Sequence, residues 1–205
     1  MSEDWRGNPE VTKKKELWKI LDLVNASPND VFCDLGCGHG KLCIWASKKV
    51  KHAIGTENDR RRYRIAKRKT RQNKSKNITI LNEDYRYPRT LRKLRNCTIL
   101  YCTNDEGLGF YKKIEETVGS GAYFVTYYIP PYPIKPEFHD DWVYVMRTPF
   151  KVAKNKKEWV RALGKGKSLT HLERRISRGF TDYKEKILEL NEEVNGLEWV
   201  FRKRK

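Results

Sequence analysis

The sequence predicts an α/β fold in which a mostly parallel sheet has helices on both faces and an antiparallel pair of strands at one edge. Two observations support this fold. Short apolar segments alternate with segments of helical periodicity across residues 10–129, and two later apolar segments follow each other without a helix between them. The chain of 205 residues is also long enough to bury one large core without disulfides or a structural metal.

Five short apolar segments, each bounded by polar residues or glycine, are predicted to be parallel strands. They are residues 31–35, 53–56, 78–81, 97–102 and 122–129. The predicted helices, where apolar residues recur at helical spacing, are 10–24, 41–50, 58–73, 91–95 and 110–118.

The pattern changes after residue 129. Residues 142–146 and 158–163 are predicted to be two strands of an antiparallel hairpin at the sheet edge. A Gly-Lys-Gly sequence at 164–166 then introduces a basic segment with helical periodicity. We therefore expect one domain over residues 1–165 and a basic, mainly helical C-terminal extension over 166–205.

Positive charge is concentrated in two regions. The chain has 44 Lys and Arg against 26 Asp and Glu, a net charge of +18. Residues 60–76 contain ten basic and no acidic residues, residues 151–205 contain 16 basic and 8 acidic residues, and the remainder is neutral overall. This distribution favours a polyanion or an acidic protein surface as partner over a merely solvated helix face. Because Tyr63 is the only aromatic residue in 60–76, phosphate or acidic-protein contact is favoured over base stacking there. The candidate substrate- or nucleic-acid-binding residues are Arg61, Arg62, Arg64, Lys67, Arg68 and Lys69.

Other features exclude several classes of protein. No run of about 18 apolar residues is present, so we expect no membrane span. The first residues are acidic and lack the apolar centre of a secretory signal. Five cysteines, without paired Cys-x-x-Cys units, indicate reduced thiols and no metal site. We expect a soluble, monomeric protein of the cytoplasm.

A glycine-rich segment, Asp34-Leu35-Gly36-Cys37-Gly38-His39-Gly40, follows the first strand and leads into a helix. Glycines there allow close approach of the backbone to a ligand. A dinucleotide site would have glycine where Lys41 stands. Asp34 would repel a pyrophosphate but would accept hydrogen bonds from an ammonium group. Glu57 ends the next strand, where an acid bonds ribose hydroxyls. The ligand that fits has a ribose, an amino-acid end and no phosphate, and S-adenosylmethionine meets this description.

Asp84 and Tyr85 follow the third strand, where an acid can accept from the adenine amino group and an aromatic ring can lie against the base. A glycine loop by itself is more often only a loop. The prediction depends on the ordered set of acids at successive strand ends. The candidate cofactor-binding residues are Asp34, Gly36, Cys37, Gly38, Gly40, Glu57, Asp84 and Tyr85.

On these residues the chain resembles the Rossmann-like, seven-stranded S-adenosylmethionine-dependent methyltransferases over about residues 10–165. Within them it looks most like the disruptor-of-telomeric-silencing histone-lysine methyltransferases and their small archaeal relatives. The segments that support this are 32–40, 55–57, 83–85 and 100–104. Asn8-Pro9 also resembles a loop that covers the cofactor in those relatives. The resemblance implies a methyltransferase domain at 1–165, S-adenosylhomocysteine as product, and an archaeal source.

The resemblance also implies catalytic residues. In that family an Asn beside the transferred methyl follows the fourth strand. Asn104 can fill this place, although a strict alignment puts Thr103 there. Asp105-Glu106 stands where the family has an aromatic segment. For a lysine acceptor, a dry aromatic channel reduces the roughly 4–5 kcal/mol needed to deprotonate the amine at pH 7. The channel candidates are Trp5, Tyr85, Tyr101, Tyr127 and Tyr128, with core packing as the alternative for Tyr101 and Tyr127. The catalytic candidates are therefore Asn104, Thr103, Tyr101 and Tyr127.

The absence of two sequence motifs at the fourth strand reduces the number of possible methyl acceptors. There is no Asn/Asp-Pro-Pro-aromatic motif of adenine-N6 or glutamine methyltransferases, and Cys102 lacks the preceding proline of cytosine-C5 enzymes. A lysine, an RNA 2′-hydroxyl or ring nitrogen, and a small molecule remain as possible acceptors. We expect transfer to lysine ε-amines of a basic, chromatin or other nucleic-acid-associated protein by direct in-line attack, with DNA or RNA contact through the basic regions. The alternatives are an RNA methyltransferase and a nucleic-acid-binding module on a methyltransferase fold.

Overall fold

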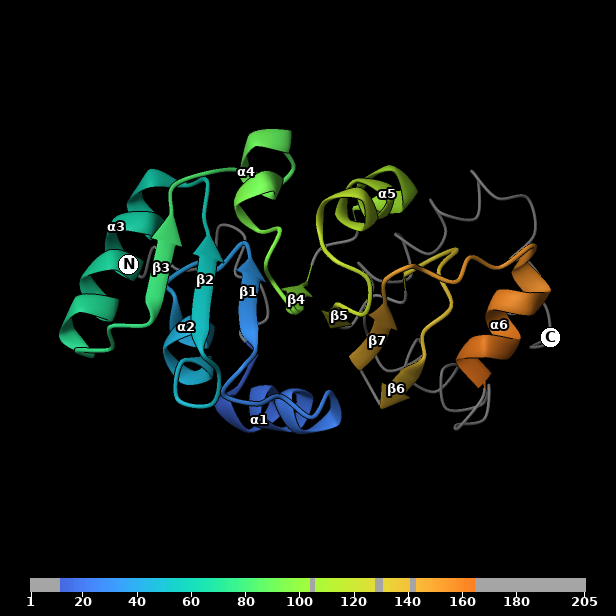
Figure 1. The fold of residues 1–205 in the computed structure, drawn as a ribbon, viewed down its shortest axis with the longest axis horizontal. Helices are drawn as coiled ribbons and strands as arrows, with labels where there is room; N and C mark the ends of the chain where they lie inside the picture. The colour runs from blue at the N-terminus through green and yellow to red at the C-terminus, as the bar shows by residue number, and fades with distance from the viewer. Residues whose placement is uncertain (1–11, 104–105, 128–130, 141–142, 165–205) are drawn as a thin grey trace, which may run out of the picture. The chain divides into compact units, whose positions relative to one another are not determined.

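A computed structural model of the protein describes residues 12–103, 106–127, 131–140 and 143–164 (Figure 1). The chain divides into two compact units, Met1–Trp159 and Val160–Lys205. All of the architecture below belongs to the first unit except the end of the last helix. The expected boundary at residue 165 and the helical extension beyond it lie at or outside the described residues and stay predictions.

Seven strands form one mixed sheet, with the order β3-β2-β1-β4-β5-β7-β6. Neighbours among β1 to β5 are parallel, and β7 is antiparallel to both β5 and β6. The arrows of β1, β2 and β3 point the same way in Figure 1. The predicted parallel sheet with an antiparallel edge is thus confirmed. The strands are β1 Val31–Leu35, β2 His52–Thr56, β3 Ile78–Leu81, β4 Ile99–Cys102, β5 Tyr123–Tyr127, β6 Phe138–Asp140 and β7 Val143–Arg147.

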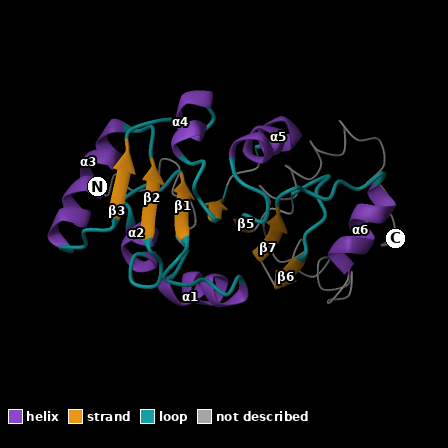
Figure 2. Cartoon of the chain, in the orientation of Figure 1, coloured by secondary structure: helices purple, strands orange, loops and turns teal. Residues whose placement is uncertain are grey.

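Helices alternate with the first five strands (Figure 2), as the hydrophobic periodicity predicts. The second of them ends four residues earlier than expected, at Ala46. The helices are α1 Lys14–Leu23, α2 Lys41–Ala46, α3 Arg60–Gln72, α4 Pro88–Lys93, α5 Gly107–Thr117 and α6 Lys156–Gly164.

Both faces of the sheet are covered. Successive side chains of a strand point to opposite faces. On one face Phe32 and Val125 pack with Leu17 of α1 and Ala46 of α2 in a buried cluster. On the other face, the Phe124 ring packs edge-on against rings of α5 at centroid distances of 5.4 and 6.4 Å. This double burial explains why the parallel strands are almost continuously apolar.

The predicted strand at 158–163 is wrong, because this segment lies within α6. Asn155 Oδ1 accepts a hydrogen bond from the Glu158 N–H at 3.0 Å, and Glu158 accepts one from the Lys154 N–H at 2.7 Å. These bonds satisfy N–H groups at the start of the helix and favour a helix over a strand. The indole N–H of Trp159, one of the residues of the predicted strand, donates to the Ile134 carbonyl at 3.1 Å. The partner of β7 is instead the three-residue β6, too short to show an alternating pattern.

The strand ends lie level with one another. Leu35 is paired with Thr56 and with Cys102, and Thr56 is paired with Leu81. The loops after β1, β2, β3 and β4 therefore leave the sheet at the same edge. The chain order also reverses between β1 and β4, with β2 and β3 on one side and β5 on the other. Ligands of open α/β sheets bind at the carboxyl ends of the strands at such a reversal.

Candidate functional site

The loop between β1 and α2 depends on three glycines. Gly36, Gly38 and Gly40 have φ angles of 86°, 52° and 74°. Residues with a side chain rarely adopt this left-handed backbone. The loop is fastened to β2, because the Gly36 and Cys37 N–H groups donate to the Thr56 carbonyl at 3.0 and 2.8 Å. The predicted glycine loop is therefore a rigid turn at the carboxyl edge of the sheet.

The loop also lies very close to its neighbours. A Cβ atom on Gly55 of β2 would lie 2.7 Å from Cys37 Sγ and 2.9 Å from Cys43 Sγ. A Cβ atom on Gly40 would lie 3.1 Å from the Ala66 Cβ of α3. The Cys37 side chain is thus a buried packing group beneath the loop. Gly55, which belongs to the segment 55–57 that supports the family resemblance but was not predicted as a site residue, is needed for this packing.

Asp34 presents a carboxylate at the reversal point of the sheet. The residue is only 4% exposed, and among the described residues no group donates a hydrogen bond to its side chain. Burial, together with the negative charge of Glu57, raises the pKa of Asp34 to about 7. A buried carboxylate without a donor is unfavourable. A cationic N–H group from a ligand is the partner that would stabilise it.

Glu57, which is 5% exposed, joins the loops of three strands. Its Oε2 accepts from the Gly38 N–H and its Oε1 from the Asp59 N–H, both at 2.8 Å. Its carbonyl accepts from the Asn82 side-chain amide at 2.8 Å. Asn82 was not predicted as a positioning residue, although its place directly after β3 was an available signal.

The segment after β3 brings Asp84 and Tyr85 to the same edge. Arg86 binds both oxygens of Asp84, at 2.9 Å to Oδ1 through Nε and 2.6 Å to Oδ2 through Nη2, and these bonds lower the pKa of Asp84. The Tyr85 ring lies beside Gly36, since a Cβ on that glycine would be 3.7 Å from Tyr85 Cε1. The Tyr85 hydroxyl donates to Glu106 Oε1. Glu106, at the start of α5, was not predicted as a site residue.

The catalytic candidates lie at two different depths. Thr103 is half-buried directly after β4, one residue beyond the level of the strand ends. Tyr101 and Tyr127 are 1% and 3% exposed and belong to the core cluster, and the Tyr101 hydroxyl hydrogen-bonds Thr12 Oγ1 at 2.5 Å. The catalytic assignments stay predictions. The expected acceptor-side residues Asn104, Trp5 and Tyr128 lie outside the described part of the chain. So does the pair Asn8-Pro9, which was expected to cover the cofactor.

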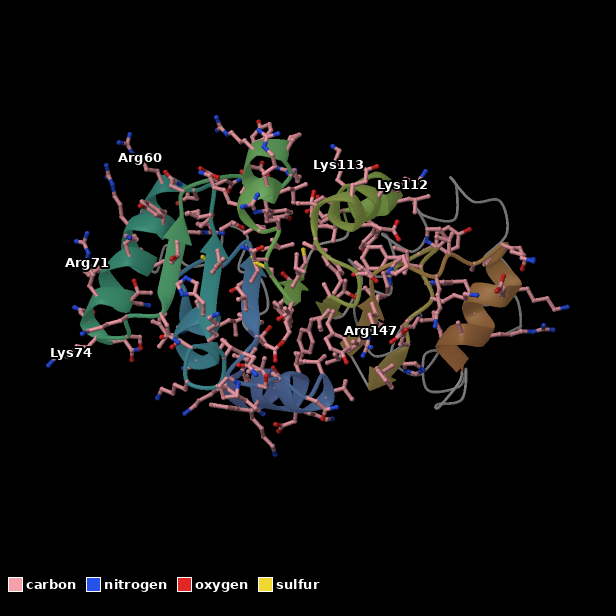
Figure 3. The ribbon with its side chains drawn as sticks, in the orientation of Figure 1. Arg60, Arg71, Lys74, Lys112, Lys113 and Arg147 are labelled. Atoms are coloured by element: carbon pink, nitrogen blue, oxygen red, sulfur yellow. The ribbon has the colours of Figure 1, made fainter. Side chains whose placement is uncertain are left out.

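The basic residues of α3 lie away from the glycine loop. The helix is buried through Ala66 and Thr70. Arg61, Arg64 and Arg68 are exposed on the opposite side of the helix, whereas Arg62, Lys67 and Lys69 are half-buried. In Figure 3 Arg60 and Arg71 of α3, and Lys74 after it, extend away from the sheet. Arg64 and Arg68 therefore lie on the side of α3 opposite its buried face, and the described hydrogen bonds and salt bridges do not connect them to Asp34 or Glu57.

The described residues contain neither a membrane-spanning helix nor a cluster of metal ligands. No helix there combines the length and the apolar character needed to cross a membrane. In the same ranges, no group of three or more His, Cys, Asp or Glu side chains is arranged to hold a metal ion.

Comparison with known sequences gives two partial matches. The family model for the histone methylation protein DOT1 matches residues 10–106, just under half of the chain. A protein-lysine N-methyltransferase of Saccharolobus islandicus is 42% identical over 53 residues, 24% of this chain. The match spans 33% of that relative's length. Each match therefore concerns a part of the chain.

Comparison with solved structures identifies the fold. An RNA methyltransferase from Salinibacter ruber, crystallised with S-adenosylhomocysteine, matches with a TM-score of 0.61 and 19% identity, over 71% of this chain and 97% of that one. A precorrin-6y C5,15-methyltransferase from Geobacter metallireducens matches with a TM-score of 0.50 and 15% identity, over 58% of this chain and 64% of that one. At these identities the likeness shows a shared fold.

Proposed function

We propose that this chain, which has the fold of class I S-adenosylmethionine-dependent methyltransferases, transfers a methyl group to lysine ε-amines of a protein. The observation that carries the proposal is the Asp34 carboxylate, buried without a donor among the described residues at the point where the strand order reverses. The ligand this carboxylate needs has a positively charged N–H donor, and the amino group of S-adenosylmethionine supplies one.

The residues around Asp34 fit the rest of this cofactor. Glu57 already accepts one N–H bond on each oxygen, and a carboxylate oxygen has a second acceptor direction available for a ribose hydroxyl. Asp84 and Tyr85 would hold the adenine end, with Tyr85 fixed beside Gly36. When bound, the cofactor supplies an electrophilic methyl group on a sulfonium sulfur.

The residues after β4 would receive the acceptor. A lysine must attack as the neutral amine, and at pH 7 its deprotonation costs roughly 4–5 kcal/mol from a pKa of about 10.4. Thr103 and, next in sequence, Asn104 follow the strand end where an acceptor would be aligned, and alignment supplies much of the rate in such a transfer. The choice of lysine is supported by the DOT1 model match and by the relative named as a protein-lysine N-methyltransferase.

RNA is the second candidate acceptor, and the exposed arginines of α3 are the observation that favours it. Arg61, Arg64 and Arg68 present positive charge that suits phosphates as well as an acidic protein surface. We propose for α3 a role in holding the substrate or its associated nucleic acid in either case.

The test is transfer of radiolabelled methyl from S-adenosylmethionine into a cell extract that is then treated with protease or nuclease. The lysine proposal requires label that is lost with protease and kept with nuclease, followed by mass spectrometry to locate the modified lysine. Label lost with nuclease would establish RNA as the acceptor. The Asp34→Ala variant should lose the signal, whereas Glu116→Gln, an exposed change on α5, should retain it. No label with the unchanged protein would contradict both acceptors and leave a binding module.

A further inference from the structure

A second set of cations surrounds α4, in a part of the chain whose total charge is neutral. Its acids, Glu83 and Asp84, form salt bridges with Lys93 and Arg86. The three remaining arginines have no salt-bridge partner among the described residues. All three are exposed: Arg89, Arg92 and Arg95. Because both acids are paired with Arg86 and Lys93, the positive charge of the other three arginines is not neutralised locally.

An exposed aromatic ring lies beside the first of these arginines. Tyr87 is 56% exposed, the largest value among the exposed large apolar side chains of the described residues. The Arg89 guanidinium lies 5.7 Å from the centroid of its ring. Exposing a tyrosine ring gains nothing for the fold, whereas a ring flanked by arginine is the arrangement on which nucleobases stack.

The position of this ring connects it to the site. Tyr87 lies two residues after Tyr85 and forms the N-terminal cap residue of α4. The segment Asp84–Tyr87 is closed by a hydrogen bond from the Tyr87 N–H to the Asp84 carbonyl at 3.3 Å. The ring and the glycine loop thus belong to loops that leave the same edge of the sheet.

We propose that Tyr87, Arg89, Arg92 and Arg95, the α4 surface, bind single-stranded nucleic acid. One base stacks on the Tyr87 ring and the arginines contact the neighbouring phosphates. An acidic protein would use the arginines but would have no need of the ring, and a duplex hides the faces of its bases. The α4 surface includes none of the cofactor residues and does not require methyl transfer, so it goes beyond the proposed function.

The experiment is fluorescence anisotropy of the full chain with a short labelled oligouridine and its deoxythymidine counterpart, each at several salt concentrations. Tyr87→Ala should raise the Kd about tenfold or more, since one stacked base contributes that much. It should leave the slope of log affinity against log salt unchanged. Arg92→Gln with Arg95→Gln should instead flatten that slope by about 0.7 for each phosphate that the protein no longer neutralises.

The controls distinguish the effect of the α4 surface from the effect of losing positive charge elsewhere and from the effect of unfolding. Lys48→Gln with Lys51→Gln removes the same charge from exposed positions beside the amino end of β2 and should change affinity less. Tyr87→Phe keeps the ring and should bind as the unchanged protein does, provided that thermal melting shows every variant folded. Binding insensitive to Tyr87→Ala, tighter binding of a duplex or of polyglutamate, or no binding would overturn the proposal. Oligouridine and deoxythymidine results then distinguish RNA from DNA.

Discussion

At the scale of single residues, the Asp34 carboxylate lowers the stability of the ligand-free protein and is the group proposed to bind the ligand. Its carboxylate is held in a buried position with a second acid, Glu57, nearby and no donor among the described residues. Such an arrangement destabilises the ligand-free fold and is kept only if something else uses it. The same residue should therefore respond in opposite directions to measurements of stability and of ligand binding.

Replacing Asp34 with asparagine should stabilise the ligand-free protein at about pH 8. The folded-state pKa of about 7 lies above the ordinary 3.8, so the folded chain loses stability as the pH rises through this interval. Removing the charge should raise the free energy of unfolding by up to about 4 kcal/mol at high pH and by little at about pH 4. Urea melts of both proteins at the two pH values test this, and an equal effect at both would contradict it.

The same titration predicts how S-adenosylmethionine binding depends on pH. The ammonium group of the ligand requires the ionised carboxylate, so affinity should fall below about pH 7, approaching tenfold for each pH unit. Calorimetry between about pH 6 and about pH 8 measures this. In Asp34→Asn, affinity should be roughly 10- to 100-fold weaker, and the pH dependence should disappear. A pH-independent affinity in the unchanged protein would place the ligand elsewhere.

Glu57→Gln should weaken the hold on the glycine loop. One amide oxygen can replace only one of the two carboxylate acceptors, so either the Gly38 or the Asp59 N–H loses its bond. We expect a loss of about 1–3 kcal/mol in stability and weaker cofactor binding. Hydrogen exchange at the Gly38 and Asp59 amides reads this directly, and unchanged protection at both would show that the bonds do not form.

At the scale of elements, α2, β2 and α3 are separated by distances that only glycine allows. Gly55 places the backbone of β2 directly against the Cys37 and Cys43 sulfurs, and Gly40 places the loop against Ala66. The glycine loop is consequently shaped by packing beneath it as well as by its own φ angles. Small changes in the packing at Gly55, Cys43 or Ala66 should therefore alter the conformation of the loop.

Gly55→Ala is expected to destabilise the protein by about 1–3 kcal/mol, because the added methyl group overlaps two sulfurs. It should also weaken cofactor binding by displacing Cys37 and the loop. Gly109→Ala, in α5, has nothing within 4 Å of the added atom and should be neutral or stabilising by up to about 1 kcal/mol. Thermal melting and calorimetry on both variants make the comparison; equal stabilities would remove the packing argument.

At the scale of the whole molecule, charge and cofactor site are separated. The exposed cations of α3 lie opposite the face that packs at Ala66 and Thr70. We therefore propose that they attract a substrate by its charge and do not contact the bound cofactor. The net charge of +18 implies that substrate association depends strongly on salt.

Arg64→Gln combined with Arg68→Gln should reduce the salt dependence of nucleic-acid binding while leaving the affinity for S-adenosylmethionine unchanged. Each phosphate that is no longer neutralised should lower the slope by about 0.7 for a single strand or about 0.9 for a duplex. Anisotropy at several salt concentrations and calorimetry with the cofactor provide the two readings. An unchanged slope would make α3 an ordinary solvated helix.

The parallel sheet, the ends of its strands and the acids at those ends could be predicted from the amino-acid sequence. These features depend on local pattern: apolar segments of period two or 3.6, the glycines before α2, and acids at the ends of β1 and β2. Strands 31–35 and 78–81 were predicted with the observed bounds. Residue identity alone was sufficient because every parallel strand of such a sheet delivers its carboxyl end to one edge.

The partner of β7 and the surroundings of the site residues could be established only from the three-dimensional structure. Trp159 belongs to a helix because Asn155 and Glu158 cap it and Ile134 bonds its indole. Tyr85 lies beside Gly36 because the loop after β1 and the segment after β3 meet at the sheet edge. Asp34 is buried there without a donor among the described residues. Burial and the distances between segments remote in sequence arise from packing, and a linear pattern does not contain them.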